Sequence, residues 1–338
     1  MRYRLLGRTG LRVSEIALGT MTFGEDWGWG ASRAESGRIF EAFAGAGGTF
    51  VDTACNYTNG TSERFVGELV GADRDHFVIA TKFTLTTRRN DPNGGGNSRK
   101  NLTRTLEASL RRLGTDYVDL LWLHMWDGTA AVAEVVRALD DQVRAGKVLH
   151  VGISDTPAWV VAQAVTLAEE RGWTPFCAVQ GEYSLAERAV ERDLLPMCAS
   201  LGLTFTAWGV LGGGVLTGRY NDPGPGEPLR YGTVGDRALD RGARIRALAA
   251  QREVSPLRLA VGWMLAQRDR WPLIPILGAR SAAQLREALT AQDEPLGAAD
   301  VDALSEAFGI DLGFPHDFLS SDGVRELIHG DTAALLDR

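Results

Sequence analysis

Eight short apolar segments alternate with segments of helical periodicity along most of this chain of 338 residues. Strands that alternate with helices predict a parallel sheet with the helices outside it. Eight such units favour a closed barrel over an open sheet, and no Gly-x-Gly-x-x-Gly pattern follows the first strand, as an open dinucleotide-binding sheet would require. The predicted strands cover residues 15–19, 49–52, 77–82, 118–124, 148–154, 176–180, 203–208 and 273–277.

The two ends of the chain lie outside this pattern. Residues 2–6 and 11–15 alternate in polarity around Gly10 and predict a hairpin over about 2–15, ahead of the barrel. Residues 309–338 follow the last unit and carry Phe314 and Phe318, so we expect a C-terminal tail that folds over the barrel mouth. No change in composition marks a second domain, and we therefore predict that 1–338 form a single (β/α)8 TIM barrel domain, of class α/β.

Composition and charge argue against several classes of function. The net charge is −7 and Lys and Arg form no dense cluster, whereas a nucleic-acid surface needs a basic face. No run of about 18 apolar residues could span a membrane, and the first residues do not read as a signal peptide. The three cysteines and five histidines show no metal-ligand spacing. We therefore expect a cytoplasmic protein with no metal site and with neither a nucleic acid nor a membrane as its partner.

Four residues with chemically useful side chains stand at or just after predicted strand ends: Asp52, Tyr57, Lys82 and His124. The carboxyl ends of the strands of a parallel barrel meet at one rim, so these side chains should lie together. Burying a charged lysine or aspartate costs free energy unless an opposite charge pairs with it, so Lys82 and Asp52 should form a pair. Positive charge beside a phenol favours phenolate and should lower the pKa of Tyr57 from about 10. Such a phenol can donate a proton to a carbonyl oxygen, while His124 orients that carbonyl or relays the proton.

Each of these residues also has an ordinary explanation when it is taken alone. Asp52 could cap a helix, Tyr57 could be a loop residue, and Lys82 could be a solvated strand end. His124 could be a satisfied histidine near the core. Only their occurrence together favours a reactive site. Cys55 lies in the same turn, and we interpret it as a small buried thiol rather than a redox residue.

The sequence around these residues resembles the aldo-keto reductase family. Residues 48–63 read GTFVDTACNYTNGTSE, similar to the family's Asp-Thr-Ala-x-x-Tyr…Ser-Glu motif. The resemblance covers about residues 2–292. The Gly-rich stretch at 211–218 and the turn at Ser154-Asp155 suggest the branch of bacterial general reductases and potassium-channel β subunits. Further motifs follow in the family's order: IATK at 79–82, SLRRLGTDYVDLLWLH at 109–124, GIS at 152–154, QGEYSL at 180–185, LGGGVLTG at 211–218 and PILGAR at 275–280.

This resemblance implies a (β/α)8 barrel enzyme that uses NADPH, and seldom NADH, to reduce an aldehyde or ketone to an alcohol. The hydride leaves C4 of the nicotinamide, and the implied catalytic residues are Asp52, Tyr57, Lys82 and His124, with Tyr57 as the general acid. The expected partner is therefore a small-molecule carbonyl substrate. The sequence does not identify that substrate or the preferred direction of the reaction, and it leaves open whether the chain forms a homo-oligomer.

The resemblance also implies where NADPH or NADP+ binds. Trp208 matches the residue that stacks on the nicotinamide, and the Gly-rich segment 209–214 matches the one that covers the pyrophosphate, where backbone N–H groups can approach phosphate. Arg280 and Gln284 open the helix after the last strand and match residues that hold the adenosine 2′-phosphate. The predicted cofactor-binding residues are Gly19, Thr20, Met21, Ser154, Asp155, Gln180, Trp208, Gly209, Val210, Leu211, Gly213, Gly278, Ala279, Arg280 and Gln284.

Three positions depart from the residues that the family usually carries. Asp155 stands where Asn is more frequent and adds a negative charge near the carboxamide. Ala288 stands in place of an Asn that contacts adenine, so we expect the adenine contact to be weaker or differently supplied. Trp126 stands in place of a proline and is expected to narrow the substrate pocket. The predicted wall of an apolar, aromatic-accepting substrate pocket is Phe23, Trp27, Trp29 and Trp126.

Two other functions fit parts of the same pattern. An NADP(H)-binding regulatory subunit with vestigial activity would keep the same residues, although the chain shows no obvious docking segment. A barrel lyase would use Lys82 to form a Schiff base, although the nucleotide motifs after the last two strands favour the reductase. Substrate specificity is expected in the loops 22–31, 86–97 and 219–237 and in the tail.

Overall fold

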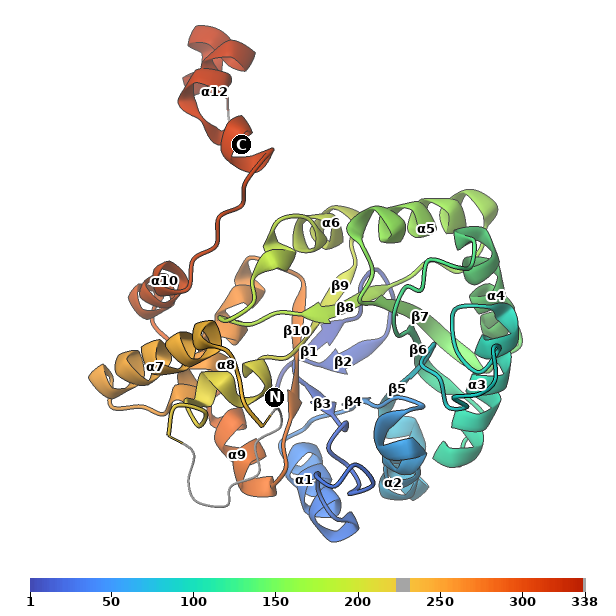
Figure 1. The fold of residues 1–338 in the computed structure, drawn as a ribbon. Coiled ribbons are helices and arrows are strands. Elements are labelled where there is room, and N and C mark those ends of the chain that lie inside the picture. The colour runs from blue at the N-terminus through green and yellow to red at the C-terminus, as the bar shows by residue number, and fades with distance from the viewer. Residues whose placement is uncertain (223–231, 337–338) are drawn as a thin grey trace.

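The computed structural model describes residues 1–222 and 232–336 (Figure 1). Within these residues eight parallel strands close into a barrel in chain order, and the last strand pairs with the first. The predicted (β/α)8 barrel is therefore confirmed. The barrel strands are β3 (Ala17–Gly19), β4 (Phe50–Asp52), β5 (Val78–Phe83), β6 (Val118–Leu123), β7 (Val148–Ser154), β8 (Ala178–Glu182), β9 (Thr204–Trp208) and β10 (Leu273–Gly278).

Helices cover the outside of the barrel, and serine side chains begin several of them. The Ser32 Oγ accepts a hydrogen bond from the Glu35 backbone N–H at 3.3 Å, and the Ser98 Oγ accepts one from the Asn101 N–H at 3.3 Å. These are N-caps, which satisfy backbone donors that have no partner inside the helix. The helices around the barrel are α1 (Arg33–Gly45), α2 (Thr61–Val70), α3 (Arg99–Leu113), α4 (Val132–Arg144), α5 (Ala158–Arg171), α6 (Leu194–Leu201), α7 (Asp236–Gln251), α8 (Pro256–Ala266), α9 (Ala282–Thr290) and α10 (Ala298–Ala307).

The N-terminal hairpin is present as predicted, and it closes one end of the barrel. Strands β1 (Tyr3–Leu5) and β2 (Arg12–Ser14) pair antiparallel. Leu6 and Val13 are fully buried and pack with apolar side chains of the barrel interior. The first barrel strand, β3, begins two residues later than the sequence predicts. Glu15 instead follows the hairpin, where its carboxylate pairs with Arg2 and Arg268.

A large tryptophan fills the barrel interior below the site. Trp122 of β6 is completely buried, two residues before His124. A Cβ at Gly152 of the neighbouring strand β7 would lie 2.3 Å from the Trp122 ring, so only glycine leaves room for it. Close packing at this level holds the ends of β6 and β7 in place.

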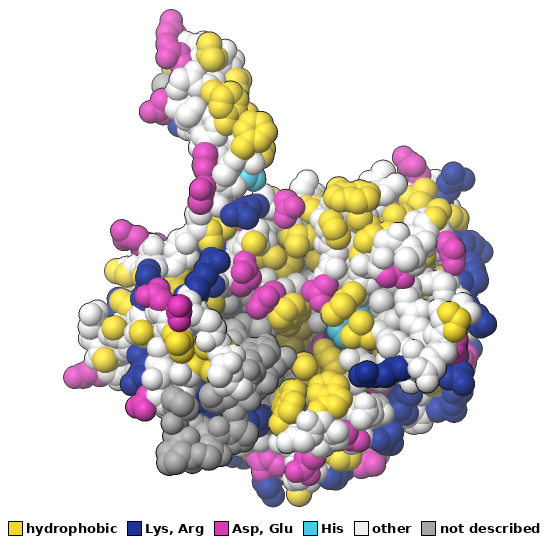
Figure 2. All heavy atoms as spheres, viewed as in Figure 1, with side chains coloured by type: hydrophobic (Ala, Val, Ile, Leu, Met, Phe, Trp, Pro, Cys, Tyr) yellow, Lys and Arg dark blue, Asp and Glu magenta, His cyan; other side chains and the backbone are white. Residues whose placement is uncertain are grey.

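The described part of the C-terminal tail, residues 309–336, does not lie over the barrel mouth, which corrects the expectation from the sequence. After α10 the chain runs away from the barrel, and α11 (His316–Ser320) and α12 (Asp322–His329) project from the body (Figure 1). Phe314 packs on Phe318 with ring centroids 6.0 Å apart. Figure 2 shows apolar side chains on one side of this projection. Phe314, Leu327 and Leu335 remain exposed, so the apolar side chains of the tail are not buried against the barrel.

Candidate active site

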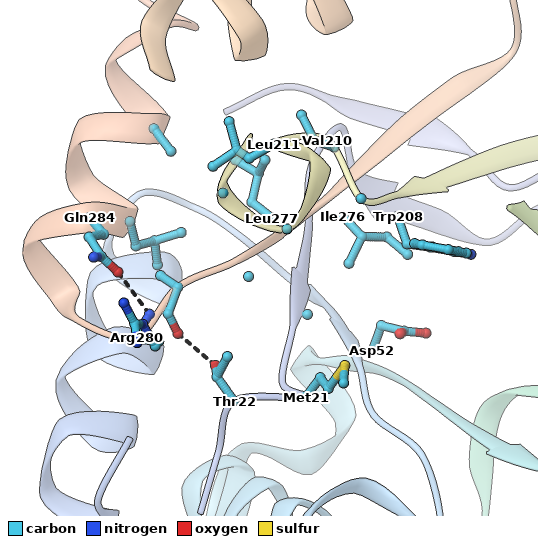
Figure 3. A pocket seen from close by; sticks show the side chains of 18 of the residues that line it. Met21, Thr22, Asp52, Trp208, Val210, Leu211, Ile276, Leu277, Arg280 and Gln284 are labelled. Atoms are coloured by element: carbon cyan, nitrogen blue, oxygen red, sulfur yellow. Dashed lines mark hydrogen bonds between the residues drawn. The ribbon is translucent and has the colours of Figure 1, made fainter. Parts of the chain in front are cut away.

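A cavity of about 620 Å³ opens at the carboxyl ends of the barrel strands. Its lining comes from residues after most of the strands and from the beginnings of α8 and α9, and Figure 3 shows part of it. In the space-filling view, apolar side chains surround a hollow at this face (Figure 2). The volume is in the range of small-molecule and cofactor sites. Among the described residues, no three His, Cys, Asp or Glu side chains are grouped as a metal site, and no helix is long and apolar enough to cross a membrane.

Lys82 links two of the predicted catalytic residues. Its ammonium donates to the Asp52 carboxylate, to the backbone oxygen of Thr53 at 2.9 Å and to the Tyr57 hydroxyl at 3.2 Å. These three bonds use all three donors of the side chain, which is fully buried. Burial alone would lower the pKa of Lys82, but Asp52 and Tyr57 raise it above its ordinary value. The ammonium is therefore a permanent charge beside the phenol.

Tyr57 keeps its proton more firmly than the sequence predicts. It begins the short helix η1 (Tyr57–Gly60) in the loop after β4, and its side chain lines the cavity. Burial raises the pKa of Tyr57, and the opposing effect of Lys82 does not outweigh it. The expected lowering is therefore wrong in direction. The phenol is protonated at neutral pH, which is the form that a general acid needs.

His124 follows β6 and faces the same cavity. Its ring lies edge-on to that of Tyr57, with centroids 6.0 Å apart. Burial and then the charge of Lys82 place the pKa of His124 well below 6.5, so the imidazole is neutral. Its Nδ1 is buried and has no hydrogen-bond partner within the described residues. The neutral ring can therefore orient a carbonyl oxygen beside Tyr57.

Cys55 lies in the same turn and is a buried free thiol. Burial raises the pKa of Cys55 to about 12. A thiol that stays protonated is a poor nucleophile, so the burial of Cys55 agrees with its interpretation as a small buried thiol without a redox role.

The next part of the cavity is bounded by polar side chains at the ends of β7, β8 and β9. Gln180 Nε2 donates to Asp52 Oδ1 at 3.2 Å, which ties this side chain to the catalytic group. Trp208 Nε1 donates to Asp155 Oδ1 at 3.0 Å, so the ring of Trp208 is held against the cavity wall. Partial burial raises the pKa of Asp155, against the effect of the Trp208 bond.

The Gly-rich segment after β9 follows a left-handed path. Gly209, Gly212, Gly213 and Gly214 have φ values of 75°, 56°, 64° and 102°. Residues with a Cβ are strained in this region, whereas glycine is not. The absence of side chains also leaves the backbone open to a ligand in the cavity, which three of these glycines line together with Val210 and Leu211.

The far end of the cavity is formed where β10 meets α9 (Figure 3). Gln284 Oε1 accepts from the Arg280 backbone N–H at 3.0 Å, and Thr22 Oγ1 donates to the Ala279 oxygen at 2.6 Å. Ser281 Oγ caps α9 by accepting from the Gln284 N–H at 3.3 Å. Helix α9 therefore begins with a serine cap, and the Gln284 side chain bonds back to the Arg280 backbone and not to that of Ser281.

Most of the predicted cofactor-binding residues line this cavity, but Thr20 does not. Thr20 is fully buried, and its hydroxyl donates to the Asp52 backbone oxygen at 3.0 Å. The residues that do line it are Gly19, Met21, Ser154, Asp155, Gln180, Trp208, Gly209, Val210, Leu211, Gly213, Gly278, Ala279, Arg280 and Gln284.

Of the four predicted substrate-pocket residues, only Trp29 lines the cavity. Bonds between the Gly24 N–H and the Ala31 oxygen, and between the Ala31 N–H and the Thr22 oxygen, fold the loop back on itself. This closure turns Phe23 into the core, where it is fully buried, which corrects its assignment. Trp27 packs on Trp29 with ring centroids 5.8 Å apart, and Trp126 packs against the core. Neither lines the described cavity, and their roles in a substrate pocket stay predictions.

Comparison with known proteins agrees with this geometry. The sequence model of the Aldo/keto reductase family matches residues 15–308. The chain belongs to the aldo/keto reductase family. It is therefore an oxidoreductase that acts on carbonyl compounds.

Similar aldo/keto reductases come from fungi. The norsolorinic acid reductase of Aspergillus flavus is 37% identical over 328 residues, which cover 94% of this chain and 84% of that protein. An aryl-alcohol dehydrogenase of Pestalotiopsis microspora is 34% identical, over 96% of this chain and 86% of that protein. The aldo-keto reductase ausK of Aspergillus calidoustus is 35% identical, over 95% and 85%. These relatives do not support the narrower placement beside bacterial general reductases and channel β subunits.

The residues of this aldo/keto reductase fit a nicotinamide dinucleotide. The buried Asn56 Oδ1 and His124 Nδ1 have no hydrogen-bond partner within the described residues, and both residues line the cavity. Buried polar atoms of this kind are normally satisfied, so a polar ligand is the expected partner. Trp208 offers a flat ring, the Gly-rich segment offers an open backbone, and Arg280 offers a cation for phosphate.

Several lining residues were not predicted from the sequence: Asn56, Leu85, Met125, Arg219 and Ser255. Ser255 caps α8, and its pattern with Pro256 could have marked a helix start facing the cavity. Arg219 lies five residues after the Gly-rich segment, and this short separation could have indicated a cation near it. Leu85 and Met125 carry no signal of their own, because their position depends on the loops after β5 and β6. The specificity loop 219–237 includes residues 223–231, which lie outside the described residues.

Proposed function

We propose that the chain is an NADP(H)-dependent reductase that converts an aldehyde or ketone into an alcohol. The observation that carries this proposal is the contact of Lys82 with both Asp52 and Tyr57 at one end of a cavity that ends at Arg280. NADPH supplies the hydride when it is bound. Tyr57 donates its proton to the carbonyl oxygen, Lys82 stabilises the phenolate that results, and His124 orients the carbonyl.

The apolar side of the cavity supports an aromatic carbonyl as the substrate. Trp29, Leu85 and Met125 line the same cavity as Tyr57 and His124. A tryptophan ring together with aliphatic side chains favours ring-shaped ligands. The names of two relatives, a norsolorinic acid reductase and an aryl-alcohol dehydrogenase, agree with this class.

The direct test is the oxidation of NADPH by the purified chain with aromatic and aliphatic aldehydes, ketones, quinones and keto-sugars. We expect turnover, with the highest kcat/KM for aromatic carbonyls. Binding of NADPH without turnover on any carbonyl would instead support the regulatory subunit.

The three free cysteines agree with the cytoplasmic location that we also propose.

The environment of Lys82 disfavours the lyase. A Schiff-base lysine attacks as a neutral amine. Here the amine has a raised pKa and donates to three protein oxygens. It does not line the cavity, whereas Tyr57 does.

Replacing Arg280 with alanine should weaken NADPH binding by about 10- to 100-fold, because a hydrogen bond to a charged group contributes about 1.5–3 kcal/mol. NADH lacks the 2′-phosphate, and its Kd should change little. Both Kd values can be measured by fluorescence titration. Arg111→Ala is the matched control, since Arg111 is exposed on α3 and does not line the cavity. Equal losses for NADPH and NADH would remove Arg280 from the 2′-phosphate site.

The rate of carbonyl reduction should be constant from about pH 6.5 to about pH 9. The pKa of Tyr57 is raised above 10.0, so the general acid keeps its proton at the upper end of this range. The pKa of His124 lies well below 6.5, so the imidazole stays neutral at the lower end. The measurement is kcat/KM against pH, corrected for acid decay of NADPH. A fall in kcat/KM towards acid pH with a midpoint near 6.5 would contradict a neutral His124. A fall towards alkaline pH with a midpoint of about 8 would contradict a protonated Tyr57.

A further inference from the structure

Glu35 of α1 reaches across to the beginning of α9. Its Oε1 accepts a hydrogen bond from the Ala282 backbone N–H at 2.7 Å, and its Oε2 accepts from Arg38 Nε at 2.7 Å. The Glu35 side chain is 21% exposed, whereas that of Arg38 is 58% exposed. The Ala282 bond and then Arg38 lower the pKa of Glu35, so the group is a carboxylate at neutral pH. A negative charge is therefore fixed at the N-terminus of α9.

Glu35 does not itself line the cavity, but its bond to Ala282 places the carboxylate beside the end that carries Arg280 and Gln284. Ala282 is the first residue of α9 and lies two residues after Arg280. The N–H groups of Arg280, Ala282 and Gln284 have protein acceptors, which are Gln284, Glu35 and Ser281 respectively. The helix terminus that would attract a phosphate thus already holds one anion.

The charges around Glu35 decide how strongly it acts on a second anion. Arg38 pairs with it directly, Arg286 of α9 also acts on its charge, and Arg280 lies two residues before Ala282. A phosphate monoester carries about −1.5 to −2 charges at neutral pH. Because Arg38 and solvent screen the carboxylate, the repulsion is moderate and depends on salt.

We propose that Glu35 sets the cofactor preference of this enzyme by weakening the binding of the 2′-phosphate. It takes one N–H donor of α9 and places a negative charge beside the site. NADH, which has no 2′-phosphate, is not repelled, so Glu35 moves the enzyme from strict NADPH use towards use of both cofactors. This inference rests on the cofactor site in the proposed function.

The test compares Glu35→Gln with the wild type. Glutamine keeps an oxygen that can accept from the Ala282 N–H and removes the charge, so the contact between α1 and α9 is retained. We expect the ratio of the Kd for NADH to the Kd for NADPH to rise by about 10-fold at low salt, and by less at high salt. The Kd for NADH should stay within about 2-fold. Glu41→Gln is the control, because Glu41 is an exposed carboxylate on the same helix.

Other outcomes would overturn the inference in distinct ways. Equal changes for both cofactors would assign Glu35 a structural role only. An unchanged ratio would mean that its charge does not act on the phosphate, and weaker NADPH binding in Glu35→Gln would mean that the carboxylate helps to hold the cofactor. If the wild type binds neither cofactor, the proposed function itself fails, and this is seen before any variant is made.

Discussion

Replacing Tyr57 with phenylalanine should lower the turnover of carbonyl reduction by about 10²- to 10⁴-fold, the usual contribution of a positioned general acid. The phenol is the donor that lines the cavity and is hydrogen-bonded to Lys82 at 3.2 Å. Phenylalanine keeps the ring and removes only the hydroxyl. The affinity for NADPH should therefore stay nearly unchanged. Stopped-flow single turnovers and fluorescence titrations measure the two quantities separately.

The control for this experiment is Tyr117→Phe, because the Tyr117 hydroxyl donates to Asp75 Oδ1 at 2.8 Å and neither residue lines the cavity. Its loss should leave the chemical step intact. If Tyr57→Phe retains wild-type turnover, the proton comes from another group and the proposed mechanism is wrong. If NADPH binding is lost together with turnover, the effect of Tyr57 is structural.

Replacing Lys82 with methionine should destabilise the protein by about 3–5 kcal/mol and abolish turnover, because removing one partner leaves the other charge buried without compensation. Asp52 would remain, with its side chain 4% exposed, and among the residues that the structure describes it would retain only the hydrogen bond from Gln180. The loss of the ammonium also removes the charge that stabilises the phenolate of Tyr57. Urea unfolding and NADPH oxidation measure the two effects.

The double variant Lys82→Met with Asp52→Asn separates stability from catalysis. Neutral asparagine removes the unpaired charge, so most of the stability should return while turnover stays absent. Recovery of turnover in the double variant would contradict the role of Lys82. A loss of stability below about 1 kcal/mol in the single variant would mean that Asp52 is compensated by other groups.

Much of the barrel and of its reactive centre follows from local pattern. Apolar runs and helix starts are short-range signals, and the side chains of Ser32, Ser98 and Ser281 cap helices that begin directly after them. Strand ends of a parallel barrel converge, so Asp52, Lys82 and His124 come together without further information. Small errors at boundaries, such as the late start of β3, arise where Glu15 finds partners far away in sequence.

Other features depend on contacts that no local pattern contains. The pKa of Tyr57 is a balance between burial and the nearby charge of Lys82, and the residue types alone do not show which effect is larger. Phe23 and Trp29 have similar surroundings in the sequence, yet the closure of their loop buries one and leaves the other on the cavity. The Glu35 carboxylate bonds to the backbone of Ala282, 247 residues away, and no pattern near Glu35 in the sequence contains this contact.

The sequence by itself determined the barrel, the four residues at its rim and the order of the motifs along it, because repeating units and strand ends obey short-range rules. Only the tertiary structure decided which aromatic side chains face the cavity, that the tail projects away from the mouth and that Glu35 occupies the start of α9. These depend on the balance of burial, charge and long-range packing, which exists only after the chain has folded.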